Sequence, residues 1–202
     1  GKAEIIANIT YGPLSTGSLV ALKGDGTGEL WVNNSAMLGN GTSVAVGDIN
    51  GDGSPEIISS REYEAALFAP GDYTAVAWDA NGNQIWESEH FTGLDMDWAT
   101  QPILSDMDGD GEIEIVVGRV ILRADGTTRG VGEHGRGSYG ISGFGDFSVS
   151  EASSPAVSDL DLDGQQELIV GNARYDADGN TLFYDATADD AMIAIADLDN
   201  DP

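Results

Sequence analysis

The sequence predicts an all-β fold: a β-propeller-type repeat of about four four-stranded blades, standing alone or as part of a larger propeller. Two observations lead to this prediction. The acidic motif Asp-x-Asp/Asn-x-Asp-Gly-x-x-Glu occurs in three complete copies, and short β-prone runs separated by Gly-containing turns follow each copy. No long stretch has the 3.6-residue apolar period of an amphipathic helix. Short strands repeated in register along a chain are typical of propeller blades.

The acidic motif also divides the chain into units. Complete copies begin at Asp48, Asp106 and Asp159, and a fourth begins at Asp197. We therefore expect a single repeat domain over residues 1–202. Its units are 1–47, 48–105, 106–158 and 159–196, with the start of the next motif at 197–202.

The shortest unit shows the expected strand plan most simply. Four strands are expected after its acidic loop, at residues 167–171, 173–176, 181–184 and 191–196, and the last leads into the next motif. Equivalent strands of the other units are expected at 18–22, 29–32, 74–78, 83–86 and 119–123, with loop insertions at 62–72 and 130–153. Trp31 and Trp86 follow hairpin turns, so we expect them in the blade core.

The amino-acid composition argues against several classes of function. There are 35 acidic and 8 basic residues, for a net charge of −27, which argues against nucleic-acid binding because phosphate contacts need a basic surface. No apolar run is long enough to span a membrane, so we do not expect a transmembrane protein. Cysteine is absent, which excludes disulfides and thiolate metal sites.

The repeated motif has the chemistry of a calcium site. Carboxylates at positions 1, 3 and 5 can converge on one ion, the glycine at position 6 permits a sharp turn, position 7 offers its backbone carbonyl, and the position 9 glutamate closes the site. We expect three complete Ca²⁺ sites, with these residues: Asp48, Asn50, Asp52, Ser54 and Glu56; Asp106, Asp108, Asp110, Glu112 and Glu114; Asp159, Asp161, Asp163, Gln165 and Glu167.

Other metal sites fit less well. An EF-hand needs a glutamate at position 12 and flanking helices, whereas position 12 here is Ser59, Val117 or Val170, inside an expected strand. Zinc is disfavoured because His90 and His134 lie outside the motifs. Magnesium prefers to keep its waters, whereas these loops supply many protein oxygens. We expect each loop to join the last strand of one blade to the first strand of the next.

The chain ends carry pieces of a further motif. Residues Asp197, Asp199 and Asp201 lack their glutamate, and Glu4 lacks its aspartates. These halves predict a fourth site split across the termini, which would meet within a ring or between neighbouring copies in a head-to-tail, calcium-linked assembly. The plainer alternative is that the chain is a fragment of a larger propeller.

The segment at residues 44–58, Val-Ala-Val-Gly-Asp-Ile-Asn-Gly-Asp-Gly-Ser-Pro-Glu-Ile-Ile, and its counterparts resemble the FG-GAP/VCBS repeats of integrin-like propellers. The resemblance implies blades with calcium in an inter-strand loop, in secreted or surface proteins. The family commonly ends this loop with Asp, whereas this chain has Glu. Residues 75–86 also resemble a quinoprotein-type propeller repeat, which we interpret as architecture and not as quinone binding.

The leading functional prediction is an extracellular calcium-binding repeat domain with a structural, adhesive or matrix-forming role, in contact with protein or carbohydrate of the cell surface. The alternative is a calcium-dependent polysaccharide lyase or hydrolase. Residues that bear on this alternative or on a partner surface are Glu62, Glu64, Asp95, Asp97, Arg123, Arg129, Arg136, Tyr139 and Phe144. None forms a convincing catalytic set, so we predict no catalytic residue.

Overall fold

The computed structural model describes residues 3–9, 17–38, 42–63, 72–92, 100–137, 141–144, 147–149 and 153–198. All regular elements in these residues are β-strands, so the all-β prediction is confirmed. No helix long and apolar enough to cross a membrane occurs in the described part of the chain.

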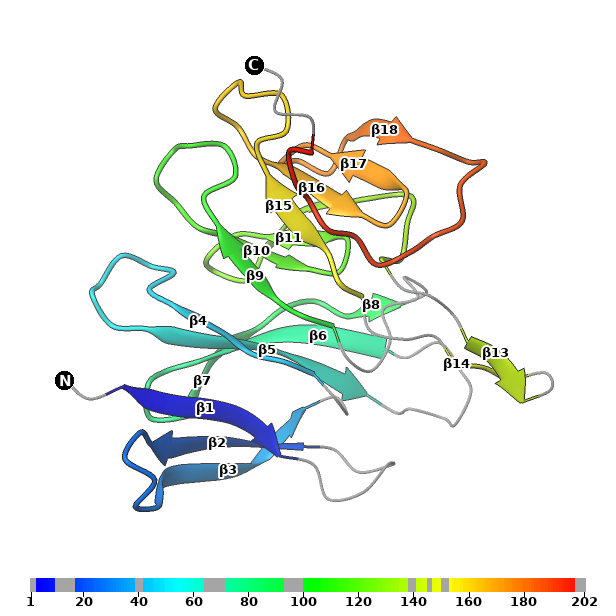
Figure 1. Cartoon of the computed structure of the whole chain (residues 1–202). Coiled ribbons are helices and arrows are strands. Elements are labelled where there is room, and N and C mark those ends of the chain that lie inside the picture. The colour runs from blue at the N-terminus through cyan, green and yellow to red at the C-terminus, as the bar shows by residue number, and fades with distance from the viewer. Residues whose placement is uncertain are drawn as a thin grey trace.

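The strands form antiparallel meanders that are stacked on one another (Figure 1). The first meander contains β1 (Glu4–Ile9), β2 (Gly17–Lys23) and β3 (Glu29–Leu38). The second contains β4 (Ala45–Gly47), β5 (Glu56–Tyr63), β6 (Asp72–Trp78) and β7 (Gln84–Glu87), with β8 (Phe91–Thr92) beside β6. One pair, Leu38 with Arg61, joins these two meanders into a single sheet.

The other two meanders are separate four-stranded sheets. The third contains β9 (Ile103–Ser105), β10 (Glu114–Val117), β11 (Val120–Leu122) and β12 (Thr128–Val131). The fourth contains β15 (Ala156–Ser158), β16 (Glu167–Val170), β17 (Ala173–Tyr175) and β18 (Thr181–Tyr184). A separate hairpin of β13 (Ile141–Phe144) and β14 (Phe147–Val149) projects from the stack (Figure 1).

Each meander begins one strand earlier than the sequence unit. The strand before each complete acidic loop pairs with the strand after it, as in β4 with β5, β9 with β10, and β15 with β16. The prediction that a loop joins two blades is therefore wrong: each loop closes a hairpin within one meander. The reason is that a short tight loop brings its two flanking strands side by side, where they pair antiparallel.

The strand expected at residues 191–196 is also absent, since this described segment has no β-structure. In the other repeats, the strand at this position pairs with a strand that follows the acidic loop. No such partner pairs with 191–196 within the described residues, and an isolated strand has no ladder to stabilise it.

Three hydrophobic clusters lie between successive meanders, because alternate residues of each strand face opposite sides. Between the first and second meanders, the core includes Leu19, Leu38, Ile57 and Trp78. The second cluster joins the second and third meanders through Ile58, Ala77, Ile115 and Leu122, and the third joins the last two through Val116, Ile121, Leu168 and Tyr175. Trp31 and Trp86 pack at the edges of these clusters and are partly buried, close to the predicted core position.

The described strands form a stack, and no strand pairing joins the first meander to the fourth within them. Membership in a propeller, the number of blades and the division into units therefore stay predictions. The fold holds each complete acidic loop between two paired strands of the second, third or fourth meander.

Candidate metal centre

The first aspartate of each loop organises the backbone turn. Asp48, Asp106 and Asp159 each accept the backbone N–H of the position 6 glycine, at 2.8, 3.0 and 3.0 Å. These glycines, Gly53, Gly111 and Gly164, have φ values of 87°, 91° and 93°, where a side chain would be strained. The prediction that position 6 needs glycine for a sharp turn is therefore confirmed.

The last glutamate of each loop is buried and holds the start of the loop. Glu56, Glu114 and Glu167 are only 4%, 3% and 4% exposed. Each accepts the backbone N–H of position 2, at 3.0 Å from Ile49, 2.8 Å from Met107 and 2.9 Å from Leu160. One carboxylate oxygen of the glutamate thus fixes the loop, and the group is positioned before any ligand binds.

In two loops the carboxylates of positions 1, 3 and 9 converge. Ligand atoms of Asp106, Asp108 and Glu114 lie within 4.8 Å of one another, as do those of Asp159, Asp161 and Glu167. In the first loop position 3 is Asn50, whose amide donates to Glu56 Oε1 at 3.3 Å. That amide takes up one oxygen of Glu56, so the first loop presents less negative charge than the other two.

The position 5 aspartates have a different role in this structure. Asp52, Asp110 and Asp163 accept the backbone N–H of position 7 (Ser54, Glu112 and Gln165) at 2.7, 2.8 and 2.8 Å. They stabilise the turn and do not belong to the converging carboxylate groups in the described residues.

One buried oxygen in the second loop has no hydrogen-bond partner. Asp106 Oδ2 accepts from Gly111, whereas Asp106 Oδ1 is buried and has no partner within the described structure. Leaving a buried charged oxygen without a partner is costly. Three oxygen donors with one orphaned atom, and no sulfur or imidazole among them, fit a hard cation such as Ca²⁺.

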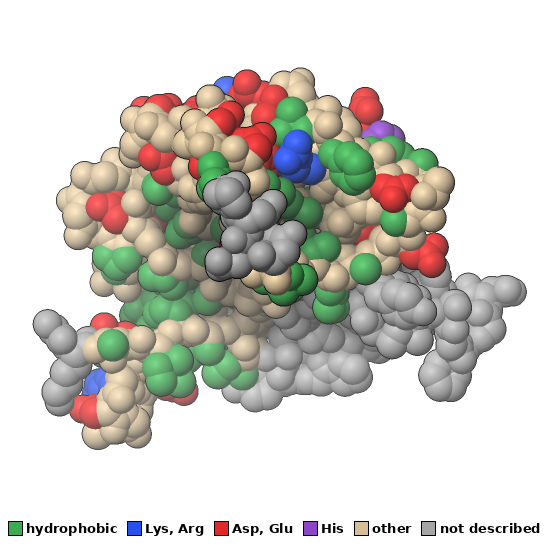
Figure 2. Space-filling model, turned by 45° about the horizontal axis from the view of Figure 1, so that its top comes forward, with side chains coloured by type: hydrophobic (Ala, Val, Ile, Leu, Met, Phe, Trp, Pro, Cys, Tyr) green, Lys and Arg blue, Asp and Glu red, His purple; other side chains and the backbone are tan. Residues whose placement is uncertain are grey.

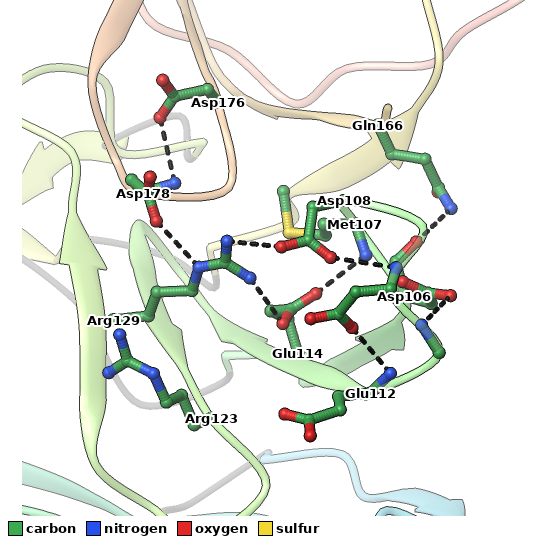
Figure 3. Close-up of polar contacts among 12 residues, drawn as sticks. Asp106, Met107, Asp108, Glu112, Glu114, Arg123, Arg129, Gln166, Asp176 and Asp178 are labelled. Atoms are coloured by element: carbon green, nitrogen blue, oxygen red, sulfur yellow. Dashed lines mark hydrogen bonds and ion pairs between the residues drawn. The ribbon is translucent and has the colours of Figure 1, made fainter. Parts of the chain in front are cut away.

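A single arginine distinguishes the second loop from the others (Figure 3). Arg129 on β12 donates to Glu114 Oε1 at 2.7 Å, to Asp108 Oδ2 at 2.6 Å and to Asp178 Oδ1 of the fourth meander at 2.9 Å. Arg123 lines the same cavity and points away from the carboxylates (Figure 3). Its side chain donates to the Thr128 carbonyl at 3.0 Å and to no carboxylate among the described residues. The acidic loop is thus already partly neutralised by one guanidinium.

These contacts shift the ionisation of the groups involved. The Arg129 hydrogen bond lowers the pKa of Asp108, while burial raises the pKa of Glu114 despite its bonds to Met107 and Arg129. Burial alone would lower the pKa of Arg129, but the bonds to Asp178 and Asp108 and the charge of Glu114 raise it well above its usual value. Arg129 is therefore a permanent cation at this site.

The second and third loops touch each other. Gln166 donates its side-chain amide to the Asp106 carbonyl at 2.9 Å and its backbone N–H to the Met107 carbonyl at 2.7 Å. Ser105 Oγ also donates to Gln166 Oε1 at 3.0 Å. The conformation of one acidic loop is therefore linked to that of the next meander.

The other predicted residues form no common site in the described structure. Glu4 begins β1 and is exposed, and Asp197 is exposed, whereas Asp199 and Asp201 lie outside the described residues, so the split fourth site stays a prediction. The ring of His134 stacks on Tyr184 at 3.8 Å, far from the acidic loops in sequence. Glu64, Asp95, Asp97 and Tyr139, and the side chains of Glu62 and Phe144, lie outside the described part.

From the sequence we considered Arg129, with Arg123 and Arg136, only for the lyase alternative or a partner surface, and we did not expect its contacts with the acidic loop. The sequence does contain a signal. In every meander the strand after the Gly-containing turn has one bulged residue. This residue is Arg129 in the third meander and is apolar in the others, as Leu30, Ile85 and Leu182. A charge at a position that is apolar in the other repeats indicates a local electrostatic role.

Comparison with known proteins supports the resemblance read from the loops. Residues 1–59 match the FG-GAP-like repeat. The biofilm matrix protein Bap1 of V. cholerae has a similar fold, with a TM-score of 0.61 and 23% identity over 91% of this chain and 27% of that protein. This chain thus spans about a quarter of the length of Bap1.

Two rhamnogalacturonan lyases give weaker matches. One is PL11 of Bacillus licheniformis, with a TM-score of 0.36 and 17% identity over 87% of this chain and 51% of that enzyme. The other is the exotype enzyme YesX, with a TM-score of 0.37 and 15% identity over 84% of this chain and 48% of that enzyme. No curated protein sequence matches this chain.

Proposed function

We propose that this chain, which carries an FG-GAP-like repeat at residues 1–59, is a calcium-binding structural module of an extracellular matrix or cell surface. The observation that carries the proposal is the convergence of Asp106, Asp108 and Glu114, together with the buried Asp106 Oδ1, which has no hydrogen-bond partner in the described structure. Asp159, Asp161 and Glu167 repeat this arrangement in the next meander.

The donor set favours calcium over the other common protein metals. All converging atoms are carboxylate oxygens, which suits a hard cation and disfavours zinc. A large ion with flexible geometry tolerates the differences between the loops, such as Asn50 in the first. In this proposal each complete loop holds one ion. Positions 1, 3 and 9 already converge in the second and third loops, and positions 5 and 7, the latter through its carbonyl, would join them when the ion binds.

The expected role of the metal is to fix a hairpin. The loop carboxylates repel one another when they are ionised and unpaired, so a cation removes a force that opens the loop. Gln166 of the fourth meander donates hydrogen bonds to the Asp106 and Met107 carbonyls of the second loop. An ion that fixes the second loop would therefore also stabilise its contact with the fourth meander. Calcium would therefore stabilise the stack even though each loop lies within one meander.

A location outside the cell agrees with this chemistry. Extracellular modules bind calcium with dissociation constants of roughly 10⁻⁴–10⁻³ M, which suits calcium-rich surroundings. The fold shared with a biofilm matrix protein supports a structural role with protein or carbohydrate partners of the surface. No described group of residues favours the polysaccharide lyase alternative.

Thermal unfolding with and without calcium tests this proposal. At a calcium concentration about 100 times the dissociation constant, each site adds about 2.7 kcal/mol to the free energy of unfolding. We expect a clear rise in Tm with Ca²⁺, a loss of that rise with EGTA, and a smaller effect of equal Mg²⁺. An identical Tm in calcium and in EGTA would overturn the proposal.

A further inference from the structure

The first acidic loop contains an asparagine followed by a glycine. Position 3 of this loop is Asn50, and Gly51 follows it with a φ of 74°. The second and third loops have an acid at position 3, Asp108 and Asp161. Because glycine has no side chain to shield its backbone nitrogen, that nitrogen can approach the side-chain amide carbon of the preceding asparagine. Attack at this carbon releases ammonia and turns the asparagine into an acid.

The folded loop places two groups on the atoms that would react. Gly51 donates its N–H to Asp48 Oδ1 at 2.8 Å, so a carboxylate is positioned to accept the proton that the attacking nitrogen must lose. Asp52 donates its N–H to Asn50 Oδ1 at 2.8 Å, the shorter of its two bonds. This bond folds the Asn50 side chain back over the main chain, and it would stabilise negative charge that develops on the amide oxygen.

The amide nitrogen that would leave is also held in place. Asn50 Nδ2 donates to Glu56 Oε1 at 3.3 Å, and Glu56 is only 4% exposed. Asn50 itself is exposed, so water reaches the reacting carbon. The three polar atoms or groups of the Asn50 amide and its neighbouring nitrogen therefore each have a partner within the loop.

A second Asn-Gly pair in the described structure lacks this arrangement. Asn81 and Gly82 lie in the β6–β7 turn, where Gly82 donates its N–H to the Asp79 backbone carbonyl at 2.9 Å. The Trp31 ring lies over this glycine, within 2.8 Å of the place where a Cβ would be. Asn81 is exposed, so it serves as an internal control with the same dipeptide but no carboxylate on the glycine nitrogen. A third pair, at residues 40–41, lies outside the described residues.

We propose that Asn50 is a site of spontaneous deamidation, which the folded first loop promotes. The Gly51 nitrogen bonds to Asn50 Cγ and gives its proton to Asp48; the Cγ–Nδ2 bond then breaks, and the leaving nitrogen takes that proton and departs as ammonia. Water opens the resulting five-membered imide at the new N–Cγ bond, which restores the main chain and leaves an aspartate at position 50. One water is consumed and one ammonia is released, with no oxidant or reductant.

The product completes the carboxylate set of the first loop. Positions 1, 3 and 9 would then all be acids, as in the two loops whose carboxylates converge. The change adds one negative charge to a chain of net charge −27, whose face in Figure 2 shows more acidic than basic side chains. The new carboxylate would face Glu56 where an amide donated before, so the loop would depend more on a cation. This consequence rests on the proposed calcium function, whereas the deamidation itself does not.

Peptide mass spectrometry of the freshly purified chain, incubated in EGTA and sampled over time, tests the deamidation. In the folded chain Asn50 should convert about 10-fold faster than Asn81, and Asp48→Asn should remove this difference, since a positioned base is lost. In urea the two asparagines should convert at equal rates, because the loop is unfolded. Asp106→Asn makes the same substitution at the equivalent position of the second loop and should leave the rate at Asn50 unchanged.

Three results would overturn the proposal. These are equal rates at Asn50 and Asn81 in the folded chain, a faster conversion of Asn50 in Asp48→Asn, and isoaspartate as the sole product, since the last would arise from opening the imide on its main-chain side. Fragmentation that distinguishes aspartate from isoaspartate identifies the product.

Asn50→Asp, made directly, tests the consequence for the metal. Calorimetric titration should show calcium binding to the first loop about tenfold tighter than in the wild type, because one more charged ligand is present. Equal affinity would contradict the stated effect on the loop. Conversion of Asn50 in EGTA would stand even if neither chain bound calcium, so failure of the calcium proposal and failure of the deamidation are separate results.

Discussion

Arg129 donates from Nη1 to Glu114 Oε1 at 2.7 Å, and Glu114 is the buried last residue of the second acidic loop. The same guanidinium binds Asp108, so one fixed cation holds two of the three carboxylates that converge in this loop. The third loop has no equivalent ion pair among the described residues, although it brings the same carboxylates together. The two sites should therefore differ in their calcium affinity.

Replacing Arg129 should tighten calcium binding to the second loop and weaken the metal-free fold. Removing one positive charge within a few ångströms of a divalent ion is expected to raise its affinity about tenfold. Without metal, Arg129→Gln should cost about 3 kcal/mol, since it leaves Glu114 as a buried charge without its partner. Calorimetric titration and chemical denaturation would measure the two effects.

Arg123→Gln is the control for this prediction, because the Arg123 side chain lines the same cavity and, within the described structure, donates to a backbone carbonyl and not to a carboxylate. It should change both quantities much less. A lower calcium affinity in Arg129→Gln would contradict the prediction and would mean that Arg129 orients the metal ligands instead of competing with the ion.

Asp106→Asn should remove most of the calcium response of the second loop. Asparagine keeps the size of the side chain and can still accept from Gly111, but it replaces the unpartnered carboxylate oxygen by a neutral group. The calcium-dependent gain in unfolding free energy should shrink by about 2.7 kcal/mol at saturating metal. Asp185→Asn, at a half-buried acid outside the loops, should leave the gain unchanged; an equal loss in both variants would show a general charge effect.

The turn glycines should reveal how tightly the meanders pack. Gly126→Ala places a methyl group against the Trp86 ring, which should cost about 1–3 kcal/mol from overpacking in addition to the strain of a positive φ. Gly26→Ala, measured in dilute protein, should cost only the strain, because its surroundings are open. Equal losses of unfolding free energy for the two variants would contradict the packing account.

The metal-free protein should lose stability in acid partly through its turn aspartates. The hydroxyl and backbone N–H of Thr127 lower the pKa of Asp125, so ionised Asp125 stabilises the folded turn. Its contribution is present above the unfolded carboxyl pKa and is lost as pH falls through the lower folded value. Asp125→Asn should flatten the pH dependence of Tm below about pH 4; an unchanged profile would show that Asp125 does not contribute.

Much of the fold could be predicted from the sequence because its signals are local. Asp-Gly and Asn-Gly turns between apolar runs indicated the hairpins at Gly82, Gly126 and Gly179, and the structure has all three. The pairing of the strands was harder to predict. An acidic loop between two strands looks the same in sequence whether the strands share a sheet or belong to neighbouring sheets, so the loops were assigned to the wrong connection.

The sequence indicated which residues belong to the candidate site, but it did not indicate most of the contacts that these residues make. The spacing led us to expect positions 1, 3 and 5 to converge, with position 9 closing the site. The structure brings together positions 1, 3 and 9, as in Asp159, Asp161 and Glu167, while position 5 accepts a hydrogen bond within the turn. The backbone bond from position 2 to the glutamate was not predictable, because it depends on burial of that side chain. The contacts of Arg129 and Gln166 arise between elements far apart in the chain, and only the packed meanders bring them together.

The most direct test of the central claim is the metal content of the purified chain after equilibrium dialysis against calcium, measured by mass spectrometry. We expect one calcium ion for each complete acidic loop, with the second loop filling after the third in the wild type and together with it in Arg129→Gln. A chain that retains no calcium above the dialysis buffer, or that takes up magnesium equally well, would contradict the account.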